Sequence, residues 1–151
     1  MEEAVTFTGP VAHDDMPAYL AAMDVAVAPY PGLVDFYFSP LKLFEYMAVG
    51  RPVVVSRVTQ VAHVVVEGET ALQFDPGDRA GLVACLQRLR GDATLCRDLG
   101  RKASSLIQST YTWRHNAARV VSWVEPLVTT PYRPSADLPY RFEEGSVQWQ
   151  R

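Results

Sequence analysis

The sequence predicts an α/β fold in which a three-layer parallel β-sheet is connected by crossover helices and is followed by a helical part and an aromatic, proline-rich tail. Short apolar runs alternate with helical patterns over the first two-thirds of the 151 residues, which is the order that builds parallel sheets. After Pro126 these patterns end. A chain of this length forms one domain of ordinary size, so we expect a domain over residues 1–128 and an extended tail over residues 129–151.

Four runs are predicted to be strands: residues 5–8 (VTFT), 24–28 (DVAVA), 52–56 (PVVVS) and 71–74 (ALQF). The second run is almost continuously apolar, which is typical of a strand that helices cover on both faces. Before it, Asp14 and Asp15 are expected to cap a helix, because an aspartate side chain accepts hydrogen bonds from free N–H groups. Apolar residues follow them at helical spacing, at Met16, Tyr19, Leu20 and Met23.

The next helix is expected to begin with Ser39 as its cap and Pro40 in its first turn, where no backbone donor is needed. It ends before Gly50, a residue type that favours helix termination. A Pro76-Gly77-Asp78 turn then leads into two helices with apolar stripes. The stripes comprise Leu82, Val83, Leu86 and Leu89 in the first helix and Leu95, Leu99, Ala103, Leu106 and Ile107 in the second.

The overall composition is that of a globular protein, with 48% apolar residues. The net charge of −3 creates no field that attracts nucleic acid, and the arginines are scattered, so nucleic-acid binding is not expected. The apolar runs are too short to cross a membrane, and the N-terminus lacks the basic and then apolar order of a signal peptide. We therefore expect no transmembrane segment and a cytosolic location.

The cysteines and histidines do not predict a metal site. Cys85 and Cys96 lack metal-ligand spacing, and we expect both to stay reduced and to pack within helices. His63 and His115 have no partner at ligand spacing, and His13, beside a helix start, is expected to be a surface residue.

The segment most informative about function is SPLKLFEYMAVGRPVVVS, residues 39–56, which places a helix N-terminus after a loop that follows a strand. Ligands of open α/β sheets bind at that end of the strands. Free N–H groups around Leu41 and Lys42, together with the helix dipole, favour an anion such as a diphosphate. Glu45 lies one turn further on and faces the same side as Lys42, so its carboxylate could accept from ribose hydroxyls. The same spacing also fits a solvated face with a weak Lys42–Glu45 ion pair, and spacing alone leaves both interpretations open.

Several motifs occur in order around this segment: VTFTGPV, YLAAMDVAVAP, SPLKLFEYMAVGRPVVVS, GETALQFDPGD and YTW. Over residues 5–124 they resemble the C-terminal domain of the large retaining glycosyltransferase family 4, whose two-domain architecture is called GT-B. The resemblance implies a partial Rossmann-like GT-B domain. It also implies transfer of a sugar from a nucleotide diphosphate sugar to an acceptor hydroxyl, with retention at the anomeric carbon. No metal and no cofactor are implied besides this donor substrate.

The resemblance assigns roles to the residues of the central motif. Glu45 is implied to hydrogen-bond the ribose of the donor. The backbone amides around Pro40, Leu41 and Lys42 are implied to contact the diphosphate or the donor sugar. Ser39 opens the motif and is counted with the donor site, and Lys42 and Glu45 are the two residues that we expect to serve catalysis.

The flanking motifs have implied roles as well. In the family, the segment after VTFTG holds the nucleotide base through backbone contacts, which here fall on Pro10 and Val11. In the family, the aromatic side chains of the YTW motif anchor the last helices, so Tyr111 and Trp113 are expected to pack and not to stack on a base. Thr112 between them is expected to cap a helix from residue 113 to about residue 124.

The chain departs from the family pattern in two ways. Many members carry a second glutamate eight positions before the one matching Glu45, where this chain has Tyr37, as in the subgroup with FSPLK. Asp35 either replaces that carboxylate or, as we favour, supports a turn. The second departure is that no βα units with the family's arginine and lysine pair, and no acceptor-binding domain, precede VTFTG. We therefore expect a truncated chain that is inactive alone.

Two other interpretations stay open. In the first, the chain is a non-catalytic pairing subunit that is completed by a separate N-terminal acceptor domain or by self-association. In the second, it is an inactive fragment. For a pairing subunit, the predicted docking surfaces are the exposed sheet edge at residues 5–8 and the aromatic tail.

Overall fold

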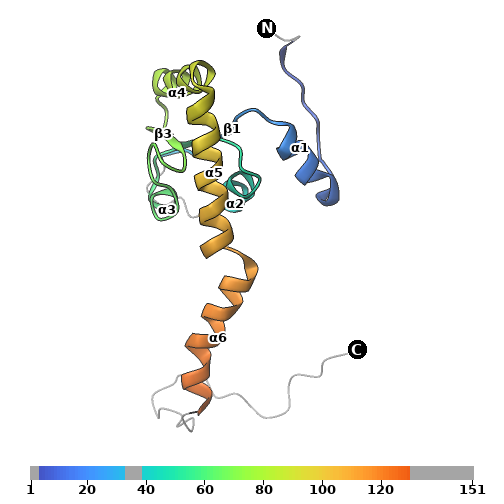
Figure 1. The fold of residues 1–151 in the computed structure, drawn as a ribbon, viewed down its shortest axis with the longest axis vertical. Helices are drawn as coiled ribbons and strands as arrows, with labels where there is room; N and C mark the ends of the chain where they lie inside the picture. The colour runs from blue at the N-terminus through green and yellow to red at the C-terminus, as the bar shows by residue number, and fades with distance from the viewer. Residues whose placement is uncertain (1–3, 33–38, 130–151) are drawn as a thin grey trace. The chain divides into compact units, whose positions relative to one another are not determined.

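The computed structural model of the chain describes residues 4–32 and 39–129. In it, β1 (Ala26–Ala28), β2 (Val53–Ser56) and β3 (Leu72–Phe74) form one parallel sheet in the order β1-β2-β3. Val54 of the central strand is aligned with Val27 on one side and Leu72 on the other. The predicted α/β fold with a parallel sheet is therefore confirmed (Figure 1).

Helices precede, connect and follow the strands. A 3₁₀ helix, η2 (His13–Asp15), continues directly into α1 (Met16–Ala22), and α2 (Leu41–Ala48) lies between β1 and β2 in the chain. The single turn α3 (Thr59–Ala62), between β2 and β3, was not predicted. After β3 come α4 (Arg79–Gly91), α5 (Ala93–Thr110) and α6 (Trp113–Thr129).

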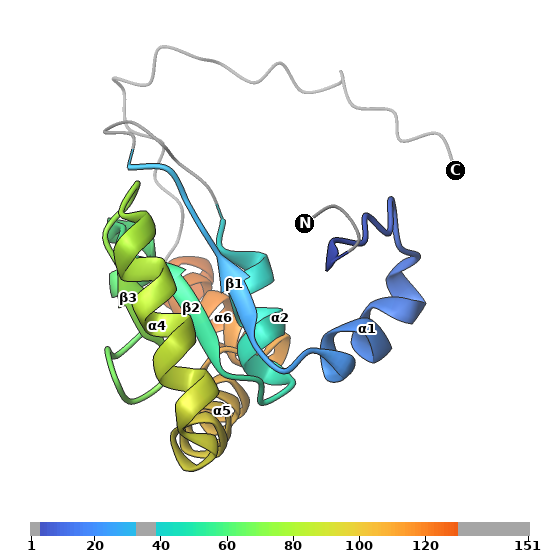
Figure 2. The same ribbon diagram turned by 90° about the horizontal axis from the view of Figure 1, so that it is seen from above.

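Helices cover the sheet on both faces, because its strands are apolar on both faces. Val53 and Val55 pack in one core with Met47 of α2. Val54 points to the opposite face, as alternate residues of a strand do, and packs in a second core with Leu89 of α4. Figure 2 shows α2 and α4 on opposite sides of the sheet. The three predicted layers are therefore present.

Helix α5 contributes to both cores and passes close to the end of α2. Leu99 packs in the core on the α4 side, whereas Ala103 and Ile107 pack on the α2 side. Between them, Gly100 lies against Gly50, and a Cβ atom added to Gly100 would stand 2.0 Å from the Gly50 carbonyl oxygen. Only glycine permits this close approach of two backbones.

Residues 5–8, which we predicted to be a strand, are not one. Val5 and Phe7 are 57% and 93% exposed, and no described strand is paired with this segment. An extended segment without a hydrogen-bonding neighbour or apolar cover is not stable as a strand, whatever its residue preferences. The docking edge predicted at residues 5–8 is therefore absent, and the outer strands of the described sheet are β1 and β3.

The helix caps differ from prediction at α1 and α2. Asp15 has helical φ and ψ angles of −86° and −19° and makes no side-chain cap, because it continues the 3₁₀ turn that also contains Asp14. A capping residue needs an extended backbone instead. At α2 the N-cap is Pro40 and not Ser39, since the Leu41 N–H already turns back to the Ser39 carbonyl oxygen at 2.8 Å.

The turn before α4 matches its prediction. Gly77 has a φ of +82°, and the Asp78 carboxylate accepts a hydrogen bond from the Gly81 N–H at 2.9 Å. The apolar stripe of α4 is shifted, however, because Val83 is 50% exposed. The residues that face the core at i, i+3, i+4 and i+7 are Leu82, Cys85, Leu86 and Leu89.

The chain divides into two compact units, Met1–Thr112 and Trp113–Arg151, so that α6 belongs to the second. Helix α6 runs on through Pro126 and so extends beyond the predicted end near residue 124. The packing role predicted for Trp113 is wrong, because this side chain is 80% exposed in a helix that buries no described residue. The Tyr111 prediction is confirmed, since its ring lies 5.3 Å from that of Phe44.

Some predictions lie outside the described residues, namely those for Asp35, Tyr37 and residues 130–151. The domain boundary predicted at residue 128 stays a prediction. No helix in the described ranges is both long and apolar enough to cross a membrane.

Candidate functional site

Helix α2 carries three of the seven predicted site residues, Leu41, Lys42 and Glu45, and begins at the carboxyl end of the sheet. It lies between two parallel strands in the chain, so it runs antiparallel to both of them as it returns. Leu43 and Met47 are fully buried and fix this orientation. The first turn of α2 therefore lies where open α/β sheets bind their ligands.

Within residues 4–32 and 39–129, one amide group at the start of α2 has no acceptor. The Leu41 N–H donates to the Ser39 carbonyl oxygen at 2.8 Å, and the Leu43 N–H donates to that of Pro40 at 2.9 Å. No described residue accepts a hydrogen bond from the backbone N–H of Lys42. The prediction of a free amide is therefore wrong for Leu41, whose donor is used within the turn.

The side chains of Lys42 and Glu45 are both exposed. Neither forms an ion pair with any residue in the described ranges, so the weak pair that the spacing left open is not formed. The Lys42 ammonium and its backbone N–H both carry positive charge at the helix start, where the dipole also favours an anion. Among the described residues, Lys42 and Glu45 thus have no partner that would compete with a ligand.

A cavity of about 190 Å³ lies between α1 and α2, and Glu45 lines it. Ala48 and Val49, three and four residues further along α2, continue the same wall. The other wall consists of His13 together with Met16, Pro17 and Leu20. Glu45 is therefore turned out of the core towards a space that a ligand group can enter. His13 is exposed, as predicted, yet it shares this cavity with Glu45.

Two tyrosines, Tyr46 beside Glu45 and Tyr30 beside Tyr46, were not singled out in the sequence. Burial raises the pKa of Tyr46, and the negative charge of Glu45 raises it further. Burial also raises the pKa of Tyr30, with a smaller contribution from Tyr46. Both hydroxyls are therefore protonated at pH 7. Two signals could have identified them: Tyr46 adjoins Glu45, and Tyr30 lies two residues after the carboxyl end of β1.

The residues predicted to hold the base, Pro10 and Val11, lie just before η2. Gly9, with a φ of +67°, turns the chain immediately ahead of them. Pro10 is exposed and Val11 half-buried, and neither lines the cavity beside Glu45. Their contact with a base stays a prediction.

Within the described residues, no group of three or more His, Cys, Asp or Glu side chains is arranged to hold a metal ion. Cys85 and Cys96 are free and half-buried, which confirms the packing role predicted for them. The Cys96 thiol contacts the Leu89 carbonyl oxygen at 3.2 Å. His63 contributes only its backbone carbonyl, which accepts a hydrogen bond from the Tyr111 hydroxyl at 3.2 Å.

Comparison with known families identifies the chain. The family described as glycosyl transferases group 1 matches residues 1–92. The chain belongs to this family. The predicted family is therefore confirmed, and the fold agrees with it.

Among curated relatives, this group 1 glycosyltransferase chain is 28% identical over 113 residues to a glycogen synthase of Mycobacterium tuberculosis, covering 74% of the chain and 26% of the relative. It is 31% identical over 119 residues to a D-inositol 3-phosphate glycosyltransferase of Pseudarthrobacter chlorophenolicus, covering 78% of the chain and 27% of the relative. The chain thus spans about a quarter of the length of these two enzymes.

Solved structures show the same fold. A sucrose-phosphate synthase of Thermosynechococcus elongatus superposes with a TM-score of 0.74 at 29% identity, covering 84% of the chain and 31% of that protein. The C-terminal domain of a group 1 glycosyl transferase of Francisella tularensis gives a TM-score of 0.63 at 17% identity, covering 71% of the chain and 53% of that domain. HepE of Anabaena, in complex with UDP-glucose, gives a TM-score of 0.58 at 19% identity, covering 76% of the chain and 30% of HepE.

Proposed function

We propose that this chain is the donor-binding part of a retaining GT-B glycosyltransferase and that it holds a nucleotide diphosphate sugar at the start of α2. The observation that carries the proposal is the free positive end of α2 at the carboxyl end of a parallel sheet. There, the Lys42 amide and ammonium have no acceptor among the described residues, and Glu45 lines an adjacent cavity. A diphosphate and a ribose require such a pair of groups.

Each group of the donor has a proposed contact. The diphosphate lies against the turn formed by Ser39, Pro40 and Leu41 and accepts hydrogen bonds from the Lys42 amide and ammonium. The ribose hydroxyls donate to Glu45. The base lies further along, against the backbone of Pro10 and Val11.

The proposed chemistry is transfer of the sugar with retention and without a metal ion. The bond between the anomeric carbon and the leaving phosphate oxygen breaks, and the acceptor hydroxyl attacks from the same face. Its proton passes to the leaving diphosphate. Negative charge grows on that phosphate in the transition state, so positively charged groups held nearby lower the barrier. Lys42 and the start of α2 provide part of this stabilisation.

The acceptor site is proposed to reside in a separate N-terminal half. In support, the chain spans only 26% and 27% of the length of two curated enzymes of its family. We expect the 151-residue chain to bind the donor but to release no nucleoside diphosphate in an assay with sugar acceptors. Turnover by the purified chain would contradict this.

Calorimetric titration of the chain with UDP, GDP, ADP and UDP-glucose tests donor binding and identifies the base. A Glu45→Gln change should weaken binding of the preferred nucleotide about tenfold or more, because a hydrogen bond to a charged group contributes about 1.5–3 kcal/mol. Glu69→Gln is the matched control, since Glu69 is exposed in a turn and does not line the cavity beside Glu45. Unaltered affinity in the Glu45 variant, or no binding of any nucleotide by the unchanged chain, would refute the proposal.

The alternative role as a pairing subunit is favoured by one observation: within the described sheet, β1 has a strand neighbour on one side only. Sedimentation at increasing protein concentration distinguishes the two roles. Self-association without nucleotide binding would favour the pairing subunit.

A further inference from the structure

A second and larger cavity, of about 500 Å³, opens at the opposite end of the sheet. Asp24 and Val25 precede β1, and Gly50, Arg51 and Pro52 precede β2, so the cavity lies at the amino ends of these strands. The remaining wall combines the end of α4 with the start of α5, through Leu86, Leu89, Arg90, Ala93, Cys96 and Arg97. None of these residues belongs to the proposed donor site.

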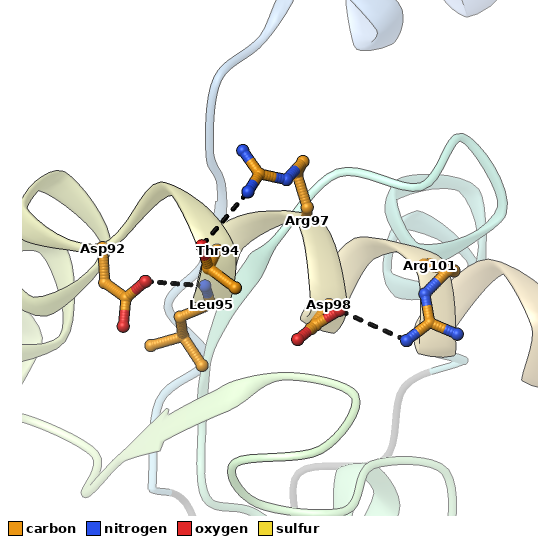
Figure 3. Close-up of polar contacts among 6 residues, drawn as sticks. All are labelled: Asp92, Thr94, Leu95, Arg97, Asp98 and Arg101. Atoms are coloured by element: carbon orange, nitrogen blue, oxygen red, sulfur yellow. Dashed lines mark hydrogen bonds and ion pairs between the residues drawn. The ribbon is translucent and has the colours of Figure 1, made fainter.

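Three arginines line this cavity, and none of them forms an ion pair with a described residue. Arg97 donates to the Thr94 hydroxyl at 3.1 Å (Figure 3). Arg51 donates to the backbone carbonyl of Ala21, and Arg90 makes no hydrogen bond to a described side chain. Each guanidinium carries five N–H donors, so most of these donors have no acceptor among the described residues.

Of the four other arginines of the same unit, two form ion pairs with described residues. Arg57 pairs with Asp75 at 3.4 Å, and Arg101 pairs with Asp98 at 3.2 Å, one helical turn beyond Arg97 (Figure 3). Ion pairs of arginine thus form in this unit where carboxylates are near. Arg79 and Arg88, outside the cavity wall, form no ion pair with a described residue either, so the cavity is distinguished by gathering three such arginines in one wall.

The negative groups near the cavity do not neutralise the positive charge of its three arginines. Asp24 is the one carboxylate in the wall. Asp92, between α4 and α5, accepts a hydrogen bond from the Leu95 N–H at 2.8 Å and caps α5 (Figure 3). Burial raises the pKa of the Cys96 thiol, so it is uncharged at pH 7. The wall consequently carries an excess of positive charge.

The floor of the cavity suits a small organic molecule. Leu89 is buried and Val25 and Leu86 are half-buried, so apolar surface lies between the arginines. The volume falls within the range of roughly 300–1,000 Å³ that is typical of small-molecule sites. A bare ion would leave most of this space unfilled.

We propose that this cavity is a second ligand site that binds a small phosphate monoester of the size of a sugar phosphate, with the phosphate group between Arg90 and Arg97. The planar guanidinium fork matches two oxygens of a phosphate, and the two arginines match its double negative charge. Arg51 is held by its contact with Ala21 and faces the rest of the ligand. Because the donor is proposed to bind at the start of α2 and this cavity adjoins its end at Gly50, both ligands can be bound together.

Calorimetric titration of the full chain with glucose 6-phosphate, and with glucose as the uncharged control, tests this site. Glucose 6-phosphate should bind and glucose should not. The Arg90→Gln/Arg97→Gln double variant should weaken binding about tenfold or more, since each lost charged hydrogen bond is expected to reduce affinity by that order. Arg88→Gln/Arg101→Gln removes the same charge from the same two helices outside the cavity wall and should leave the affinity within about twofold.

The site is distinguished from the donor site by two further measurements. Glu45→Gln and saturating UDP should both leave the affinity for glucose 6-phosphate unchanged. Competition by UDP, equal weakening in both arginine variants, or no binding by the unchanged chain would each overturn the proposal. Retention on phosphatidic acid vesicles without binding of free glucose 6-phosphate would overturn it as well, because the phosphate would then come from a lipid surface.

Discussion

Helices α5 and α6 follow one another in the chain and have similar lengths, 18 and 17 residues, yet only one of them has its apolar residues covered. Helix α5 buries Leu99, Gly100, Ala103 and Ile107. Helix α6 exposes its apolar residues, which include Val120, Val121, Trp123, Val124, Leu127 and Val128. Helical periodicity therefore predicts that a helix has an apolar face, but it does not predict whether other residues cover that face.

The difference has an energetic consequence. Burial of an apolar side chain such as Leu99 contributes about 1.5–3 kcal/mol, and α5 gains this contribution repeatedly along its length. Helix α6 buries no described residue, so the described residues give it no such contribution. Equivalent substitutions in the two helices should therefore have very different effects.

The largest difference is expected between Leu99→Ala and Leu127→Ala. Leu99 is 1% exposed and Leu127 is 72% exposed. The first change should lower the free energy of unfolding of the sheet-containing unit by about 2–5 kcal/mol, because it removes buried contacts and leaves a cavity. The second should alter it by less than about 0.5 kcal/mol. Urea unfolding followed by circular dichroism measures both, and a similar loss in the two variants would remove the contrast between α5 and α6.

The next effect concerns the contact between α5 and the end of α2. Gly100→Ala places a methyl group against the Gly50 backbone, so we expect a loss of about 1–3 kcal/mol. Gly91→Ala, at the end of α4, is the matched control, because an added Cβ atom there meets nothing within 4 Å. It should be neutral or stabilise by up to about 1 kcal/mol. A lower thermal unfolding midpoint in the Gly100 variant, with an equal or higher midpoint in the Gly91 variant, would support the assigned packing. An unchanged midpoint in the Gly100 variant would contradict it.

The smallest effect is expected at the start of α5. The Asp92 carboxylate accepts from the Leu95 N–H, so Asp92→Ala should cost about 1 kcal/mol of stability. Asp98→Ala removes an exposed ion pair with Arg101 and should cost less, about 0–1 kcal/mol. Thermal midpoints of the two variants compare these effects directly. A larger shift for Asp98 would show that the ion pair stabilises α5 more than the cap does.

Sequence patterns predicted the sheet, its helices and the position of the candidate site, because these depend on residues close together in the chain. The run of residues 39–56 contains a loop, a helix and a strand, and its spacing was sufficient to place Lys42 and Glu45. Predictions from local sequence patterns failed where the outcome depended on a hydrogen-bonding partner. Residues 5–8 have strand preferences but no strand beside them, and the Leu41 amide is used by a turn that spacing does not reveal.

By itself, the sequence determined the α/β fold, the order of its elements and the family to which the chain belongs. Only the tertiary structure decided which apolar faces are covered, why Gly100 must be glycine and which three arginines share a cavity with a single carboxylate. The physical reason is the distance along the chain over which each kind of interaction acts. Helix and strand preferences act over a few neighbouring residues, whereas Gly50 and Gly100, or Arg51 and Arg97, meet only because folding brings distant segments together.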